Sequence, residues 1–303
     1  MDSLVAIDWG TTALRGARLG PEGVVLEERS FERGLSSVPT GEFENVFSAH
    51  FGDWMARTDA LCLIGGMAGS KQGWVETPYC PCPARFEDLY GKLTWVDGPH
   101  RIGIVPGLTC NHAGIPDVMR GEELQVFGAL QVLGRFDGLL VLPGTHSKWV
   151  QVKAGHVRSF STLMTGEFYG LLRRHSILAR SMPADDAELD APAFDQGVSV
   201  ALSSRSLMQT AFGVRTLSLF DRVRAQALPS YLSGLVIGEE LRSQMNPDMA
   251  GGGDVIVIGA TALTQRYERA LSQQGIGVKT LGAAAGWRGL WAMGQVVQGG
   301  AVP

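Results

Sequence analysis

The sequence lacks two features, a long apolar run and a surplus of basic residues. Of its 303 residues 45% are apolar, yet no stretch contains the roughly 18 consecutive apolar residues that a membrane helix needs. There are 26 Lys and Arg against 30 Asp and Glu, for a net charge of −4. Nucleic-acid-binding proteins usually carry a positive excess. We therefore expect neither a membrane nor a nucleic acid as partner.

Cysteine is scarce, and we expect no secretion signal at the start of this sequence. The closest pair of the four cysteines, Cys80 and Cys82, fits neither a zinc knuckle nor a redox C-x-x-C motif. Asp2 and Asp8 stand where a signal peptide would have its basic and apolar segments. These features predict reduced thiols and a cytoplasmic location.

Glycine, by contrast, is abundant, with 40 copies. Many of these glycines form clusters between apolar stretches, as at residues 65–66 and 251–253. Glycine adopts positive φ without strain and lets a ligand approach the backbone closely. The pattern indicates an α/β enzyme with phosphate-facing loops.

One local pattern occurs twice: an apolar strand, a Gly-Thr turn and a second strand. The first copy contains Asp-Trp-Gly-Thr-Thr at residues 8–12, and the second contains Pro-Gly-Thr-His-Ser-Lys at residues 143–148. A third strand follows each copy. Three hairpin-connected strands before a helix are not the order of a dinucleotide-binding domain.

This order predicts an α/β fold of duplicated ribonuclease-H-like domains, as in actin-like ATPases, with an interdomain cleft. We expect an N-terminal domain at residues 1–134 and a second domain at 135–283. The C-terminal helix, at about 284–303, is expected to pack back on the first domain. Domain closure would then bring the two Gly-Thr turns together around a nucleotide.

Apolar spacing predicts most of the helices. An early helix is expected at residues 42–58, and a helix with Asp117 as its N-cap or near-cap is expected at about 120–134. Residues 67–90 are expected to form a loop. Later helical segments are expected at residues 166–181, 196–213, 215–227, 235–241, 261–274 and 282–293.

The first turn has the residue types of a metal and phosphate site. Asp8 can hold Mg²⁺ through water, while Gly10, Thr11 and Thr12 can contact phosphate oxygens. The alternative is an ordinary hairpin with a polar turn. The second copy makes that alternative less favoured.

The second turn has no acid equivalent to Asp8, so we expect it to bind phosphate alone. Lys148 or Arg15 would neutralise charge on the transferred phosphoryl group. Lys148 as a solvated strand lysine, and His146 as a plain turn residue, stay open alternatives. The candidate phosphate-binding residues here are Gly144, Thr145, His146 and Ser147.

A late apolar strand at residues 254–258 ends at Gly259 and Ala260, where a helix begins. A small residue at such a corner can seat an adenine against the backbone. A plain strand-to-helix turn is nearly as good an explanation.

Paired acids open the helix that precedes the second turn. Glu122 and Glu123 follow Arg120 and Gly121. A kinase acting on a hydroxyl needs a carboxylate that accepts its proton. Acids in a first helical turn also stabilise the helix dipole, but that leaves Arg120 unexplained, so catalysis is favoured.

Two polar segments, and Arg120 just before the paired acids, are candidates for binding an acidic sugar. Ser70, Lys71, Gln72 and Trp74 follow a buried strand, and Lys71 can pair with a carboxylate. Glu167 lies at a helix start, where a capping role is an equal alternative.

Five segments together resemble the 2-dehydro-3-deoxygalactonokinase family. They occur in the family's order and are spread over more than half of the chain. They are Asp-Trp-Gly-Thr-Thr at 8–12, Gly-Ser-Lys-Gln-Gly-Trp at 69–74, Met-Arg-Gly-Glu-Glu at 119–123, Leu-Pro-Gly-Thr-His-Ser-Lys-Trp at 142–149 and Met-Thr-Gly-Glu at 164–167.

The resemblance implies phosphoryl transfer from ATP, with Mg²⁺, to the 6-hydroxyl of 2-dehydro-3-deoxy-D-galactonate, in galactonate and galactose catabolism. Similarity to the larger FGGY carbohydrate kinases implies a base at Glu122, with Glu123 as the alternative. At the position of Lys71 the family motif has arginine. Lysine keeps the positive charge there, but it weakens the bidentate binding of a carboxylate.

Other functions stay open at this point. One alternative is a kinase for another sugar or sugar acid, such as 2-dehydro-3-deoxygluconate. That compound differs from 2-dehydro-3-deoxygalactonate in the configuration of one hydroxyl. An actin-like regulatory ATPase is less favoured, because the chain leaves no room for an added peptide-binding domain. A homodimer is compatible with the sequence.

Overall fold

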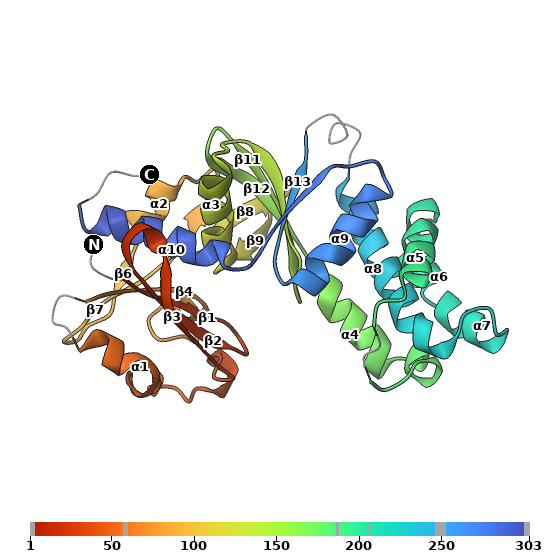
Figure 1. Ribbon diagram of the computed structural model, residues 1–303, viewed down its shortest axis with the longest axis horizontal. Helices are drawn as coiled ribbons and strands as arrows, with labels where there is room; N and C mark the ends of the chain where they lie inside the picture. Colours follow the sequence, from red (N-terminus) through yellow and green to blue (C-terminus); the bar gives the residue numbers. More distant parts are fainter. Residues whose placement is uncertain (1–3, 57–59, 186–187, 205, 246–252, 300–303) are drawn as a thin grey trace. The chain divides into compact units, whose positions relative to one another are not determined.

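The computed structural model describes residues 4–56, 60–185, 188–204, 206–245 and 253–299 (Figure 1). The chain forms two compact units. The first comprises Met1–Asp137, Val150–Phe160 and Leu281–Pro303, and the second comprises Gly138–Trp149 and Ser161–Thr280. The chain thus passes from one unit to the other four times. The sequence-based division placed residues 150–160 in the second domain, whereas they belong to the first compact unit.

The first unit is built on a six-stranded sheet with the order β3-β2-β1-β4-β7-β6. β1 pairs antiparallel with β2 and parallel with β4, so it is central in the sheet. The strands are β1 (Leu4–Trp9), β2 (Leu14–Leu19), β3 (Val25–Phe31), β4 (Leu61–Gly66), β6 (Thr94–Trp95) and β7 (Arg101–Ile104).

Different helices cover the two faces of this sheet, and the side chains of β1 point alternately to one face and the other. Val5, Ile7 and Trp9 alternate along β1 and join one buried cluster with Phe47 and Phe51 of α1 (Phe43–Phe51). α3 (Glu122–Leu133) and α10 (Ala285–Val297) pack on each other and cover the opposite face (Figure 1). Asp8, which alternates with Ile7 and Trp9, therefore leaves the sheet on the α3 and α10 side.

A small sheet of β5 (Cys80–Pro81), β8 (Leu108–His112) and β9 (Ile115–Met119) was not expected from the sequence. The prediction that Asp117 caps the following helix is wrong, because Asp117 pairs with Cys110 across β8 and β9. Gly121 is the N-cap of α3 instead, with a φ of 109°. The predicted loop at 67–90 also contains the short α2 (Phe86–Tyr90).

The second sheet has five strands in the order β12-β11-β10-β13-β14, and β10 pairs parallel with β13. Both sheets therefore place three consecutive strands in reverse order, followed by a strand reached through a helical segment. The duplicated ribonuclease-H-like fold expected from the sequence is confirmed. The strands are β10 (Gly138–Leu142), β11 (Ser147–Lys153), β12 (His156–Leu163), β13 (Val255–Ile258) and β14 (Val278–Leu281).

Most of the second unit is helical, and α5 packs closely on α8. The helices are α4 (Thr165–His175), α5 (Ala191–Ser203), α6 (Leu207–Thr210), α7 (Gly213–Leu219), α8 (Leu228–Gln244) and α9 (Thr261–Ser272). Within the described residues, short 3₁₀ helices lie at Pro21–Gly23, Leu35–Ser37, Gly52–Met55, Met67–Gly69, Ile177–Ser181 and Ala225–Ala227. Among the described helices, none combines the length and the apolar composition required to span a bilayer.

Candidate active site

The β1–β2 hairpin presents the Asp8 carboxylate beside the Arg15 guanidinium. The two residues are direct partners across the antiparallel pair, so their side chains leave the same face of the sheet. Arg15 Nη2 donates a hydrogen bond to Asp8 Oδ2, and both side chains are partly exposed. An accessible carboxylate with an adjacent cation is suited to bind a metal–phosphate complex.

Backbone hydrogen bonds from a neighbouring segment hold the hairpin turn. Gly34 N donates to Thr12 O at 3.1 Å, and Ser36 N donates to Thr11 O at 3.0 Å. Gly10 N is already bonded within the turn, to the carbonyl of Ala13. The side chains of Thr11 and Thr12 remain exposed. The hydroxyls of the two threonines are therefore available to a ligand, while the Gly10 amide is not free in this arrangement.

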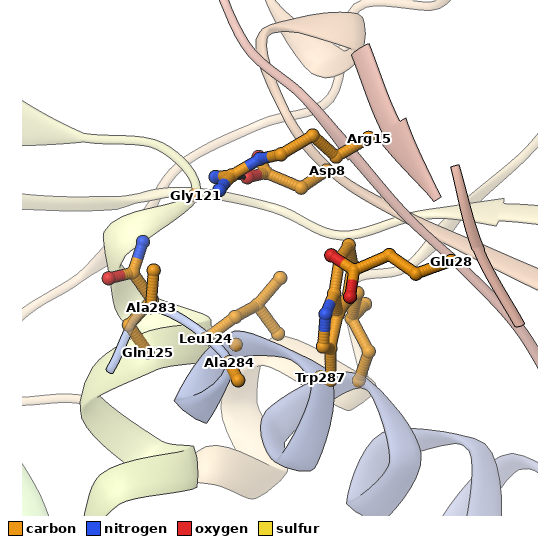
Figure 2. A pocket seen from close by; sticks show the side chains of 11 residues that line it. Asp8, Arg15, Glu28, Gly121, Leu124, Gln125, Ala283, Ala284 and Trp287 are labelled. Carbon is orange, nitrogen blue, oxygen red and sulfur yellow. Dashed lines mark hydrogen bonds and ion pairs between the residues drawn. The ribbon is translucent and has the colours of Figure 1, made fainter. Parts of the chain in front are cut away.

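A cavity of about 210 Å³ opens beside Asp8 and Arg15, within the first unit (Figure 2). The starts of α3 and α10 form its opposite wall, with Gln125 and Trp287. Glu28 of β3 also lines it. Glu28 and Trp287 were not singled out from the sequence, since no local motif distinguishes them.

Burial makes the two acids at the start of α3 unequal. Glu123 is completely buried, and both of its carboxylate oxygens lie 2.8 Å from Gly121 N. Burial, with a smaller contribution from the charge of Glu122, raises the pKa of Glu123 to about 8. Glu122 is only partly buried, and its Oε2 accepts a hydrogen bond from Arg120 N at 3.1 Å. Of the two carboxylates, Glu122 is the one that a substrate can reach.

Arg120 connects the start of α3 to the loop that follows β4. Its Nη2 donates to Thr77 O at 2.7 Å, and its guanidinium lies 4.2 Å from the centre of the Tyr79 ring. Among the described residues, neither Arg120 Nη1 nor Ser70 Oγ has a hydrogen-bond partner, although both atoms are buried. Two predicted substrate-binding residues, Arg120 and Ser70, thus belong to one connected loop and helix start.

The other predicted residues of this loop differ in environment. Lys71 and Gln72 are exposed. Trp74 is partly buried and contacts Trp9 edge-on, with ring centroids 6.2 Å apart. It also contacts Phe47, at 5.5 Å. Trp74 therefore supports the loop from the core side.

In the second unit, the turn between β10 and β11 is attached to the start of α4. Glu167 N donates to Thr145 O at 3.1 Å, and His146 Nε2 lies 2.6 Å from Glu167 Oε2. Thr145 and His146 are exposed. The structure thus brings together His146 and Glu167, which the sequence had assigned to different ligands.

The next two residues, at the start of β11, face the interior. Ser147 is completely buried, and its Oγ lies 3.0 Å from the hydroxyl of Tyr267. Lys148 is only 5% exposed, and its Nζ donates to Thr162 Oγ1 at 2.9 Å. The interpretation of Lys148 as a solvated strand lysine is therefore wrong.

A second cavity, of about 110 Å³, lies between α4, α8 and α9 and reaches Gly144. Leu263 and Arg266 of α9 line it. Ala260 is the N-cap of α9, and Gly259 approaches the carbonyl of Pro143, which lies 3.7 Å from the position of an added Cβ. Two groups of residues predicted to bind ATP, at 144–147 and 259–260, are therefore neighbours in the second unit.

Comparison with known proteins assigns the family. Residues 8–293 match the family model described as 2-keto-3-deoxy-galactonokinase. The chain belongs to this family. This match confirms the family expected from the sequence motifs. It also confirms that the protein is a kinase.

Two relatives and one solved structure of the 2-keto-3-deoxy-galactonokinase type cover nearly the whole chain. A probable 2-dehydro-3-deoxygalactonokinase of Rhizobium meliloti is 35% identical, over 94% of this chain and 97% of its own. The 2-dehydro-3-deoxygalactonokinase of Escherichia coli is 34% identical, over 90% and 91%. The crystal structure of a putative 2-dehydro-3-deoxygalactonokinase protein from Sinorhizobium meliloti is 34% identical and superposes with a TM-score of 0.89, covering 98% and 99%.

A more distant likeness concerns the fold alone. The activator of the 2-hydroxyisocaproyl-CoA dehydratase from Clostridium difficile, solved with bound ADPNP, is 12% identical and has a TM-score of 0.53 over 98% of this chain and 96% of its own.

The carboxylate of Asp8 is compatible with the ligands that a magnesium ion requires. Within the described ranges no three His, Cys, Asp or Glu side chains cluster as a metal site. Mg²⁺ in phosphoryl-transfer enzymes keeps several waters and uses one or two carboxylates together with substrate phosphates. A single, partly exposed carboxylate beside a cavity satisfies that requirement.

Proposed function

We propose that this chain is an ATP-dependent kinase that phosphorylates the 6-hydroxyl of 2-dehydro-3-deoxy-D-galactonate. The observation that carries the proposal is membership of the 2-keto-3-deoxy-galactonokinase family along residues 8–293. The Escherichia coli relative named 2-dehydro-3-deoxygalactonokinase supports the same substrate. The product would be the 6-phosphate of the sugar acid, as expected for galactonate catabolism.

Glu122 is the proposed general base. The acceptor 6-hydroxyl must lose its proton as its oxygen attacks the γ-phosphorus, and a carboxylate within hydrogen-bond reach accepts that proton. Glu122 is accessible, whereas Glu123 is buried against Gly121 N with a pKa of about 8. Glu123 would then hold the start of α3 in the conformation that presents Glu122.

The first hairpin is the proposed metal site. Asp8 would hold Mg²⁺, partly through water, and the bound ion would neutralise charge on the β- and γ-phosphates. Arg15, which is bonded to the Asp8 carboxylate, would stabilise negative charge on the transferred phosphoryl group. The exposed hydroxyls of Thr11 and Thr12 would donate to phosphate oxygens.

The second unit is the proposed nucleotide site. The Gly144–Ser147 turn, in which Thr145 and His146 are exposed, would bind phosphates through backbone N–H groups and Thr145 Oγ1, with His146 as a further donor. Lys148 would add positive charge at the start of β11. Gly259 and Ala260 would lie against the adenosine moiety, for which the cavity between α4, α8 and α9 is the neighbouring space.

The sugar acid is proposed to be held by the loop after β4 and by the start of α3. Arg120 and Lys71 are the cations that would pair with its carboxylate, and Ser70 and Gln72 would hydrogen-bond its hydroxyls. Trp74 would contribute by supporting the loop. Glu167 would hydrogen-bond a substrate hydroxyl, or hold His146 in place.

An ADP-release assay over a panel of acceptors tests the function. The panel contains 2-dehydro-3-deoxy-D-galactonate, its gluconate epimer, D-galactonate and D-galactose, each with ATP and Mg²⁺. We expect ADP release that depends on 2-dehydro-3-deoxy-D-galactonate, and a product whose phosphorus NMR signal is split by two protons of C6. Preference for the epimer would change the substrate, and ATP hydrolysis without any acceptor dependence would support a regulatory ATPase instead.

A cytoplasmic location, a homodimer and the absence of nucleic-acid or membrane partners remain predictions from the sequence. Gel filtration coupled to light scattering would measure the oligomeric state directly.

A further inference from the structure

A buried carboxylate lies at the centre of the second unit and accepts hydrogen bonds from three elements. Glu240, in α8, is 2% exposed. Its Oε1 accepts from Trp149 Nε1 of β11 at 2.6 Å, and its Oε2 accepts from Tyr267 of α9 at 2.7 Å. Thr165 Oγ1, at the start of α4, donates to the same Oε2.

The network has a defined direction, and it extends to the proposed phosphate-binding turn. The Tyr267 hydroxyl has one proton, which it donates to Glu240. It must therefore accept at its contact with Ser147 Oγ, 3.0 Å away. The hydrogen bonds thus run from Ser147 as donor to Tyr267, and from Tyr267 as donor to the carboxylate. The ionised Glu240 carboxylate is the member of this network that has only acceptor atoms.

The partners of Glu240 flank the turn on both sides. Ser147 begins β11 directly after the turn, so its hydroxyl fixes the end of the turn that enters the strand. Thr165 begins α4, the helix in which Glu167 donates its backbone N–H to Thr145 O. A single carboxylate therefore holds the two segments between which Thr145 lies.

This arrangement is costly for stability alone. Burial raises the pKa of Glu240, and the hydrogen bonds from its partners, that of Thr165 foremost, oppose the shift. Apolar residues of similar size often stabilise a core as well as or better than a buried charge. The cost is explained if the network fixes a geometry that function requires.

We propose that Glu240 is a positioning residue for nucleotide binding, which acts through Ser147 and Thr165 to hold the Gly144–Ser147 turn in its phosphate-binding conformation. The inference rests on the proposed role of that turn. Glu240 itself would not contact ATP. Tyr267 would be the intermediate link between Glu240 and Ser147.

Glu240→Gln tests the proposal with little change in side-chain size. The amide keeps one acceptor oxygen but replaces the other with an NH₂ donor, so it cannot accept from Trp149, Thr165 and Tyr267 together. We expect KM for ATP to rise about tenfold, equivalent to roughly 1.4 kcal/mol. KM for the sugar acid should change less than about twofold, and calorimetric binding of an ATP analogue without sugar acid should weaken by the same factor as KM for ATP.

Ser230→Ala is the matched control. Ser230 is buried in the same helix, and its Oγ accepts from Asp190 N at 2.9 Å, a contact that does not involve the turn. This variant should lower the melting temperature without changing KM for ATP. The same result for Glu240→Gln, a lower melting temperature with unchanged ATP binding, would overturn the positioning role.

Tyr267→Phe provides the second test, which can be used even if Glu240→Gln does not fold. It removes the link to Ser147 and keeps the ring, so KM for ATP should rise, by less than in Glu240→Gln. The double variant should bind ATP no more weakly than Glu240→Gln alone, since both changes break one chain. Unchanged ATP binding in Tyr267→Phe would contradict the proposal.

Calorimetric binding needs no turnover, so a wild-type protein that binds ATP but phosphorylates no acceptor would refute the proposed function and leave this inference standing.

Discussion

Glu122 and Glu123 are adjacent in the sequence, and burial gives them different chemistry. Glu123 points into the core and bonds to Gly121 N, while Glu122 stays accessible. The sequence predicted a base at this helix start and favoured Glu122 by resemblance, with Glu123 as the alternative. Helical phase alone could not decide between them, because the tertiary packing around α3 determines which carboxylate loses its water.

Replacing the proposed base should abolish turnover and leave ATP binding intact. We expect Glu122→Gln to lower kcat by at least about 100-fold, the usual contribution of a general base. Binding of ATP, measured by calorimetry, should stay within about twofold, since the carboxylate acts on the acceptor hydroxyl. An active Glu122→Gln together with an inactive, folded Glu123→Gln would reverse the assignment.

The raised pKa of Glu123 predicts a dependence of stability on pH. An unfolded glutamate loses its proton near pH 4.5, whereas folded Glu123 keeps it until about pH 8. Between these values the folded state binds more protons, so a rise in pH lowers the stability. We expect the fall in melting temperature from pH 4.5 to pH 8 to be smaller in Glu123→Gln than in the wild type.

The neighbouring charge provides a graded control for that measurement. Glu122→Gln removes the smaller of the two causes that raise the pKa of Glu123 and keeps the larger, burial. Its fall in melting temperature should therefore lie between those of the wild type and Glu123→Gln. Identical pH profiles for all three proteins would show that Glu123 does not titrate in this range.

At the scale of elements, the contact between α3 and α10 depends on glycine. A Cβ on Gly128 would lie 2.0 Å from the carbonyl oxygen of Ala285, so the two helices must separate to accept it. Gly128→Ala should lower the melting temperature by at least about 2 °C through this overpacking.

Gly286→Ala is the control on the partner helix. Its Cβ would meet only the Gln125 side chain, at 3.4 Å. The higher helix propensity of alanine should keep this variant as stable as the wild type, or slightly more so. Equal destabilisation by both substitutions in differential scanning fluorimetry would argue against the close-packing explanation.

The elements that the sequence predicted are those with a strong local pattern. The Gly-Thr hairpins and the apolar strand at β13 combine uniform strands with glycine turns, which makes them recognisable. The small sheet of β5, β8 and β9 was missed because Pro81 and Pro116 interrupt its short strands. Asp117 was assigned as a helix cap because Asp is common at that position; its strand pairing is set by residues elsewhere in the chain.

The Glu240 network could not be predicted for the same reason. Its members come from β11, α4, α8 and α9, which are distant in the sequence. No spacing rule joins Trp149, Thr165, Glu240 and Tyr267. Only the folded arrangement shows that Ser147, predicted as a phosphate ligand, has its side chain engaged in the core.

At the scale of the whole molecule, hydrogen exchange can map the proposed nucleotide site. A non-hydrolysable ATP analogue should slow amide exchange at residues 144–147 and 259–260, where phosphate and adenosine would replace water. Addition of Mg²⁺ should extend the protection to residues 8–12. Adenosine alone should protect only residues 259–260, and protection by the analogue confined to residues 8–12 would contradict the assignment of the two turns.

The composition of the first unit has a consequence for synthesis on the ribosome. Residues 1–137 emerge first, but this unit also needs residues 150–160 and 281–303, which include α10. The second unit needs nothing after residue 280. Although domains commonly fold from the N-terminus during translation, here the unit that begins the chain is the last to be completed. Until α10 emerges, it cannot cover the buried apolar residues of α3 on which it packs.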